Sequence, residues 1–186
     1  MNGKRISAIL LTLLLVFVLS VSAVFAASVH LKGGKNAKPS FTDGGLTLNA
    51  SGALAGLGNA DVLVTLEATA DVTSSCINPG TGEHRPPGQN PAPITVTGSQ
   101  AIPAEEIKNG TTPFNVTTFP PDPIIAGAPD CPNSNWTETI DDLAFTSATI
   151  TVEQPAGTVV LTVMCTFSPP TSDGPVPSAN VTCTSG

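Results

Sequence analysis

The clearest pattern in the chain is an alternation of apolar and polar residues over positions 61–73. Even-numbered positions in this stretch are apolar, whereas the odd-numbered ones are mostly Thr, Glu and Asp. Since successive side chains of a β-strand point to opposite faces, this pattern predicts a strand with one buried and one solvated face. The same phase continues to Cys76, so we expect its sulfur on the buried side.

Residues 158–167 alternate in the same way and place Cys165 on the apolar face. Val160 and Met164 lie on the opposite face, which predicts a central strand or one covered on both sides. Weaker patterns predict strands over residues 46–54, 94–96, 114–118, 136–145 and 149–153. Between Phe145 and Ile150 the apolar positions change from odd to even, which predicts a turn or a β-bulge near Thr146 and Ser147.

Many short strands separated by Gly-rich and Pro-rich turns predict an all-β fold, namely an antiparallel β-sandwich of immunoglobulin-like or jelly-roll type. Three stretches too rich in Gly and Pro for strand interiors predict long surface loops, at residues 78–93, 120–132 and 168–177. Long loops in compact domains often carry function.

The N-terminus has the pattern of a signal peptide. Lys4 and Arg5 precede a largely apolar run, and Val24 and Ala26 fit the cleavage pattern of signal peptidase. We therefore predict a signal peptide over 1–26, a flexible basic N-terminal arm over 27–38, and a single sandwich domain over 39–186. A retained membrane anchor is the alternative, because the uncharged stretch 6–27 is long enough to span a bilayer.

Composition and charge exclude some classes of binding partner. The chain of 186 residues has seven basic and 14 acidic side chains, and removal of Lys4 and Arg5 lowers the basic number to five. Nonspecific nucleic-acid binding requires clustered Lys and Arg, so this acidic chain is not expected to bind nucleic acid. After cleavage of the signal peptide no membrane association is expected. The predicted location is secreted, extracellular or at the cell surface.

The four cysteines predict disulfides, since an exported chain folds where thiols oxidise. Three connectivities exist, and we prefer Cys76 with Cys131 and Cys165 with Cys183, because each pair fastens one Pro-rich loop to an adjacent strand. A metal site is the weak alternative, because no two Cys are close in sequence and the chain has two histidines.

Glu83, His84 and Arg85 form the candidate binding site, at the tip of the 78–93 loop. It is the one place where an acid, an imidazole and a guanidinium are adjacent, although neighbours in an extended loop point in different directions. No catalytic residues are predicted, since no Gly-x-Ser-x-Gly occurs and exported Cys are not expected to stay free.

The carboxylate pairs Asp141–Asp142 and Glu105–Glu106 lack the aromatic platform that a glycosidase uses, because the chain has one Trp and no Tyr. No cofactor is expected. Calcium is the one ion that such acids suit, and its site would be assembled from distant loops. Five Asn-x-Ser/Thr triplets would carry glycans if the source organism modifies them, at Asn49, Asn109, Asn115, Asn135 and Asn180.

These observations predict a non-catalytic secreted β-sandwich that acts through its surface, as a cell-envelope, matrix or adhesion component. The alternative is a ligand-binding or inhibitory module that uses the 78–93 loop, and a hydrolase is the third and weakest reading. The partner is not identified. Lys32, Lys35 and Lys38 concentrate basic charge at the start of the mature chain, so self-association or an extracellular surface partner is expected.

Overall fold

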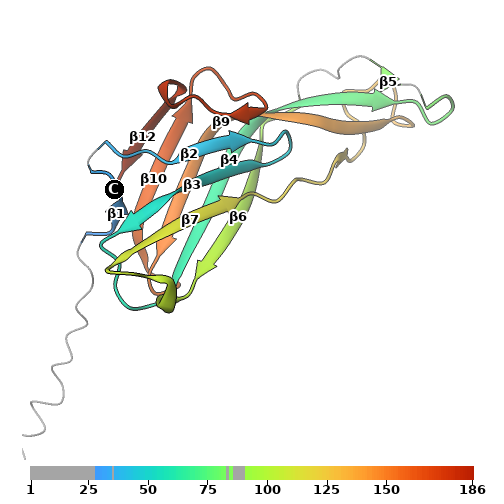
Figure 1. Cartoon of the computed structure of the whole chain (residues 1–186). Helices are drawn as coiled ribbons and strands as arrows, with labels where there is room; N and C mark the ends of the chain where they lie inside the picture. Colours follow the sequence, from blue (N-terminus) through green and yellow to red (C-terminus); the bar gives the residue numbers. More distant parts are fainter. Residues whose placement is uncertain (1–27, 35, 83, 86–90) are drawn as a thin grey trace, which may run out of the picture.

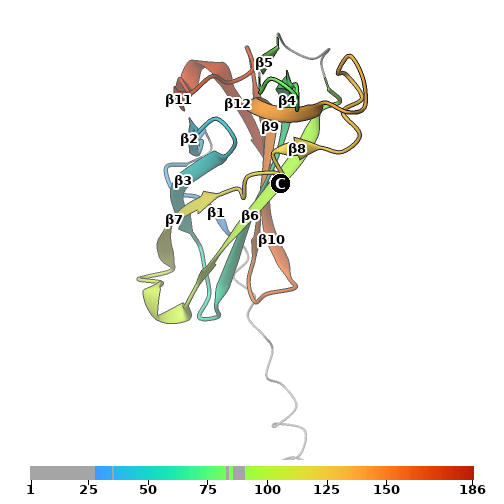
Figure 2. The ribbon, with the colours of Figure 1, turned by 90° about the vertical axis from the view of Figure 1, so that its right-hand side faces the viewer.

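The computed structural model describes residues 28–186 except 35, 83 and 86–90. In that part of the chain two antiparallel sheets pack face to face, which confirms the predicted all-β sandwich (Figure 1, Figure 2). The predicted signal peptide lies outside the described residues. In chain order the elements are β1 (His30–Leu31), β2 (Ser40–Asp43), β3 (Leu48–Ala55), β4 (Val62–Ile77), β5 (His84–Arg85), β6 (Ile94–Ile102), η1 (Ala104–Glu106), β7 (Thr111–Thr117), β8 (Ile124–Ile125), β9 (Thr137–Glu153), β10 (Val159–Phe167), β11 (Gly174–Pro175), η2 (Ser178–Asn180) and β12 (Val181–Ser185).

The first sheet is built around β3, which pairs with β7 on one edge and with β2 and β1 on the other, and β11 pairs with β2. The second sheet has the order β12-β10-β9-β4, with β6 and β5 along the free edge of β4 and β8 beside β9. The orders β2-β3-β7 and β6-β4-β9-β10 correspond to strands A-B-E and C′-C-F-G of immunoglobulin-like sandwiches. β12 is an additional strand beyond the G position.

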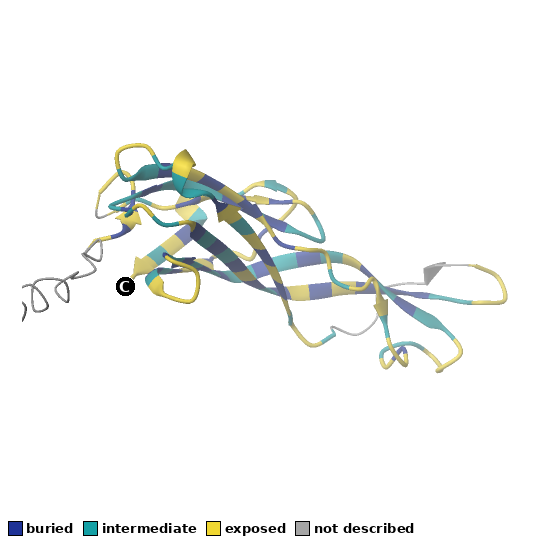
Figure 3. Ribbon diagram, turned by 90° about the horizontal axis from the view of Figure 1, so that it is seen from below, coloured by how far each residue is buried: buried dark blue, intermediate teal, exposed yellow. Residues whose placement is uncertain are grey.

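The core lies between the inner faces of the two sheets, where the alternation along each strand places its apolar residues (Figure 3). Val64 and Leu66 of β4 are fully buried, as the pattern of residues 61–73 predicts. Phe41 of β2 and Phe167 of β10 join the sheets with their rings edge to face, 5.0 Å between centroids. The packing of the two inner sheet faces against each other supplies most of the apolar burial of the fold.

The predicted strands are present, but β9 is longer than expected. The strands predicted over 136–145 and 149–153 form one strand that begins at Thr137 and has a register shift, because Ser147 faces Thr69 whereas Phe145 faces Ala70. Thr146 is therefore the extra residue of a bulge, and its hydroxyl donates to the Thr69 carbonyl at 3.2 Å. The predicted change of phase is a bulge, not a turn.

Both preferred disulfides are confirmed. Cys76 bonds to Cys131, and Cys165 bonds to Cys183. Cys76 and Cys165 are buried, as their positions on the apolar faces predict. Disulfide-bonded folds of this kind are typical of proteins in an oxidising extracellular compartment.

Part of the predicted N-terminal arm lies against the sandwich. His30 and Leu31 form β1 opposite Ala55 and Leu54 of β3. Val29 and Leu31 are buried, whereas His30 is exposed. In the structure this segment contributes to the core, where the sequence pattern predicts a flexible arm over all of 27–38. No helix in the described part of the chain is long and apolar enough to cross a membrane.

Candidate functional site

The most distinctive feature of the molecule is a two-stranded extension of β4 and β9 beyond the sandwich (Figure 1, Figure 3). The pairing of β4 with β6 ends at Ala70, and that of β9 with β10 begins at Ser147. Residues 71–77 and 137–144 pair with each other past these points. We call these two segments the ribbon. Seven residues of extended chain span roughly 20 Å, so the ribbon tip stands well clear of the core.

A second bulge sets the orientation of side chains in the ribbon. Thr73 faces Asp142, but Ser74 faces Ile140, so Asp141 is the extra residue. An extra residue exchanges the inward and outward faces, which is why Leu143 and Ile140, three positions apart, are both buried.

The two carboxylates of the Asp141–Asp142 pair have different neighbours. Asp141 accepts a hydrogen bond from the Ser75 hydroxyl at 3.1 Å, within the ribbon. The Asp142 carboxylate lies toward the β2–β3 turn, 3.7 Å from the position that a Cβ on Gly45 would occupy. The two acids thus lie in different surroundings and do not form a paired carboxylate site.

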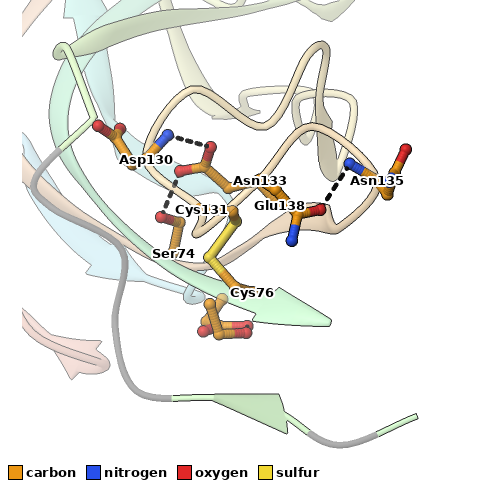
Figure 4. Close-up of a disulfide and its surroundings, with 9 residues drawn as sticks. Ser74, Cys76, Asp130, Cys131, Asn133, Asn135 and Glu138 are labelled. Carbon is orange, nitrogen blue, oxygen red and sulfur yellow. Dashed lines mark hydrogen bonds between the residues drawn. A yellow bond between two sulfur atoms is a disulfide. The ribbon is translucent and has the colours of Figure 1, made fainter. Parts of the chain in front are cut away.

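Glu138 is fully buried at the ribbon, beside the Cys76–Cys131 disulfide (Figure 4). Its Oε1 accepts from the Ser74 hydroxyl at 2.8 Å, and its Oε2 accepts from the Asp130 backbone N–H at 3.3 Å. A buried carboxyl group requires such partners, since an unsatisfied one is costly. The carboxyl group and the disulfide together fasten the segment before β9 onto the ribbon.

The segment between β7 and β9 is held to the ribbon at two further points. Ile124 and Ile125 form β8 opposite Thr139 and Glu138. The Ile140 backbone N–H donates to the Pro123 carbonyl at 2.8 Å. The predicted 120–132 loop is therefore fastened to the ribbon along its length.

The 78–93 loop returns to the ribbon at His84 and Arg85. These two residues form β5, with Arg85 opposite Cys76 and His84 opposite Ile77. Glu83 lies outside the described residues. The structure thus places the backbone of two members of the predicted site beside the disulfide, and the binding role of Glu83, His84 and Arg85 stays a prediction.

A second buried acid, Asp43, lies where the ribbon leaves the sandwich. It accepts hydrogen bonds from the Thr171 hydroxyl and from the Gly45 backbone N–H, the latter at 2.9 Å. Burial raises the pKa of Asp43, and the nearby Asp142 and Asp173 raise the pKa further, whereas the two hydrogen bonds lower it.

Thr171 links Asp43 to the ribbon strand. Its hydroxyl accepts from the Phe145 N–H at 2.8 Å while it donates to Asp43. The Thr171 N–H donates to the Phe145 carbonyl, and the Leu143 N–H donates to the Gly45 carbonyl. These bonds fix β9 at the base of the ribbon to the β2–β3 turn and to the 168–177 loop.

The other candidate groups are dispersed. Glu105 and Glu106 are exposed in η1, and His30 lies within 2.6 Å of the Ser28 carbonyl through its Nδ1. Among residues 28–186, apart from the gaps given above, no three His, Cys, Asp or Glu side chains are arranged to hold a metal ion.

The sequence analysis missed Glu138 and Asp43. A signal for Glu138 exists, because the odd spacing between Ile140 and Leu143 requires a bulge that turns Glu138 inward. Asp43 has no such signal, since its burial follows from long-range contact with Thr171.

The fold and the ribbon define a disulfide-bonded β-sandwich with a projecting, fastened extension. Searches with this chain found no matching family model, no similar curated protein and no similar solved structure.

Proposed function

We propose that this chain is a secreted, non-catalytic β-sandwich that acts through its surface, as a component of a cell envelope, a matrix or an adhesion layer. The contact surface is the ribbon tip with the 78–93 loop. The observation that carries the proposal is the fastening of the ribbon by the Cys76–Cys131 disulfide, β8 and Glu138. A projecting element that is already ordered loses little conformational entropy when it binds.

Two further observations support this reading. Ile124 of β8 is 57% exposed, so the segment fastened to the ribbon presents an apolar side chain of the kind that anchors contacts. Asp141 bonds to Ser75 whereas the Asp142 carboxylate lies toward Gly45, which does not favour the paired carboxylates of a glycosidase.

The second candidate is a ligand-binding or inhibitory module that uses the same loop. β5 favours it, because pairing of His84 and Arg85 with β4 fixes the return of the 78–93 loop beside a disulfide. The two candidates share the contact surface and differ in the partner, which is an extended biological surface in the first and a soluble molecule in the second.

The test is binding of the labelled, oxidised chain 27–186 to cells and isolated extracellular material of the organism that produces it. We expect saturable binding that the triple variant Glu83→Ala, His84→Ala, Arg85→Ala weakens at least about tenfold, with folding unchanged. The matched control is Glu105→Ala, Glu106→Ala, Lys108→Ala. These three residues follow shortly after Ile102, which pairs with Val62 at the end of β4 opposite the ribbon. The control therefore changes charges far from the ribbon tip.

Equal binding by both triple variants would show that the ribbon tip is not the contact surface. Binding of a soluble ligand or enzyme without surface binding would favour the second candidate. Hydrolytic turnover that His84→Ala or Asp141→Asn abolishes would contradict the non-catalytic proposal.

A further inference from the structure

The two lateral sides of the sandwich differ in how they are closed. On one side β6 and β7 from opposite sheets touch, because Gly98 lets the backbone approach so closely that an added Cβ would lie 2.0 Å from the Thr117 carbonyl oxygen. The Asn115 N–H donates to Gln100 Oε1 across the same seam at 2.8 Å. This side has no free strand edge along the contact.

On the other side β12 is the edge of its sheet, because it pairs only with β10 among the described strands. Thr162 and Gly186 exchange both backbone hydrogen bonds. In an antiparallel pair such bonded positions alternate with non-bonded ones, so every second residue of β12 directs its N–H and C=O away from β10. The N–H and C=O groups of Val181, Cys183 and Ser185 therefore point away from β10. Within the described part of the chain, those of Cys183 and Ser185 have no hydrogen-bond partner.

Natural edge strands are normally protected by charge, by Pro or by bulges. β12 has none of these, since its sequence is Val-Thr-Cys-Thr-Ser and its register with β10 is continuous. Two contacts exist at its beginning, where the Lys38 ammonium donates to the Val181 carbonyl and the Val181 N–H donates to the Ser178 carbonyl. The Cys165–Cys183 disulfide holds β12 on β10, so the edge is ordered before any partner arrives.

Two cavities lie along this edge, with volumes of about 460 and about 360 Å³. They separate β10 and β12 from the N-terminal segment, and the buried side chains of Val163 and Leu161 contribute to their walls. Ala37 and Lys38 line the larger cavity from the opposite side. A strand added to the β12 edge would extend this sheet, and its inward side chains would face these two cavities.

We propose that the β12 edge is a self-complementary interface through which two copies of this chain pair, antiparallel and about a two-fold axis at Cys183. In this arrangement Cys183 faces its counterpart, and Val181 faces Ser185 of the second copy, so every outward donor meets an acceptor. For all of these bonds to form, Lys38 must release the Val181 carbonyl and the Val181 N–H must release the Ser178 carbonyl.

Charge favours a second copy as the occupant. The mature chain carries 14 acidic side chains against five basic ones, so most surfaces of two copies repel. β12 has no charged side chain, and the nearest described charge is the basic Lys38. A contact through one short strand buries less than a standard interface, so weak pairing is expected.

The test is light scattering on the oxidised, unglycosylated chain 27–186 from about 5 to about 500 μM, because a small interface requires high concentration. We expect the mass to rise toward twice that of one copy, and the Cys183 and Ser185 amides to become protected from hydrogen exchange over the same range. A single-copy mass at every concentration would overturn the proposal.

Three variants locate the contact. Ser185→Pro removes an outward N–H without removing a bond to β10, and we expect it to abolish the mass increase. The matched control Ser185→Ala keeps that N–H and should associate as the wild type does. Lys38→Ala removes the protecting contact and should strengthen association. A mass increase that Ser185→Pro leaves unchanged would place the interface elsewhere. The ribbon takes no part in this contact, so the proposed function and this interface succeed or fail separately.

Discussion

The two buried carboxyl groups, Asp43 and Glu138, each join segments that are far apart in the sequence. Asp43 connects β2 to Thr171 in the 168–177 loop, and Glu138 connects β9 to Ser74 and to the Asp130 backbone. Both are satisfied by hydrogen bonds, so each specifies a local arrangement that apolar side chains alone would not fix.

The raised pKa of Asp43 predicts a definite pH dependence of stability. Its folded state binds a proton more readily than the unfolded state does. Its contribution to the free energy of unfolding is therefore complete below the ordinary pKa of 3.8 and is lost as pH rises through the raised value. The free energy of unfolding of the wild type minus that of Asp43→Asn should therefore decrease as pH rises from 3.8 through the raised pKa of Asp43. Urea unfolding at a series of pH values measures this difference.

Asp71→Asn is the control for this experiment, because Asp71 is an exposed ribbon residue. Its unfolding free energy should follow that of the wild type across the series. A difference between wild type and Asp43→Asn that stays constant with pH would contradict the assignment.

Glu138→Ala should destabilise the fold by about 1–3 kcal/mol, because it leaves the buried Ser74 hydroxyl and the partly buried Asp130 N–H without their acceptor. Glu138→Gln keeps one side-chain oxygen and should lose less. The exposed Glu67 provides the control, and Glu67→Ala should change stability by less than about 0.5 kcal/mol. Equal urea midpoints for Glu138→Ala and Glu67→Ala would refute this role.

At the level of elements, β9 shows what the sequence predicts and where it falls short. Alternation located both of its halves, and the change of phase located the bulge at Thr146. The strand continues through that bulge because β4 pairs with it on both sides, which is long-range information that no local pattern contains. The same reason explains why the ribbon was not predicted as one element.

Other features also separate into those that the sequence predicts and those that depend on long-range pairing. The disulfide pairs follow from cysteines on apolar strand faces beside Pro-rich loops, and the structure confirms them. β2 was missed because its four residues contain one large apolar side chain, Phe41, and alternation over so short a stretch is not distinctive. Its position depends on pairing with β3.

The Cys76–Cys131 disulfide should stabilise the ribbon far more than the sandwich. For its sequence separation of 55, the chain-entropy model gives about 4 kcal/mol for unfolding of the whole chain, and without the disulfide the ribbon also loses its covalent link to the segment before β9. In the variant Cys76→Ser, Cys131→Ser we expect amide protection to be lost in segment 120–136 and retained in residues 62–70 of β4 and in β10. Hydrogen exchange measured by mass spectrometry distinguishes the regions.

The comparison variant is Cys165→Ser, Cys183→Ser, whose separation of 18 gives about 3 kcal/mol on the same model. It should loosen β12 and leave segment 120–136 protected. Uniform loss of protection across the whole chain in the Cys76 variant would contradict a local role for that disulfide.

The closed side of the sandwich depends on Gly98. Gly98→Ala would force β6 and β7 apart, since the new Cβ would lie 2.0 Å from the Thr117 carbonyl oxygen. We expect a loss of about 1–3 kcal/mol or more in the free energy of unfolding. Ser99→Ala, at the neighbouring exposed position, is the control, and equal stability of both variants would show that the seam is not tight.

At the level of the whole molecule, three surfaces have different characters. One lateral side is closed by β6 and β7, the opposite side ends in the uncharged edge of β12, and the ribbon projects from one end (Figure 1, Figure 2). An acidic body keeps copies apart except where charge is absent. This division allows one part of the surface to meet a partner while another meets a second copy.

The most direct test of the central claim is site-specific photo-crosslinking from the ribbon tip. A photoreactive residue replaces Pro79, which is exposed just after β4, or Glu105 in η1 as the control. Each oxidised chain is illuminated on cells or extracellular material of the producing organism. A surface component crosslinked from position 79 and not from position 105 is the predicted result. Equal crosslinking from both positions, or from position 105 alone, would contradict a contact made by the ribbon.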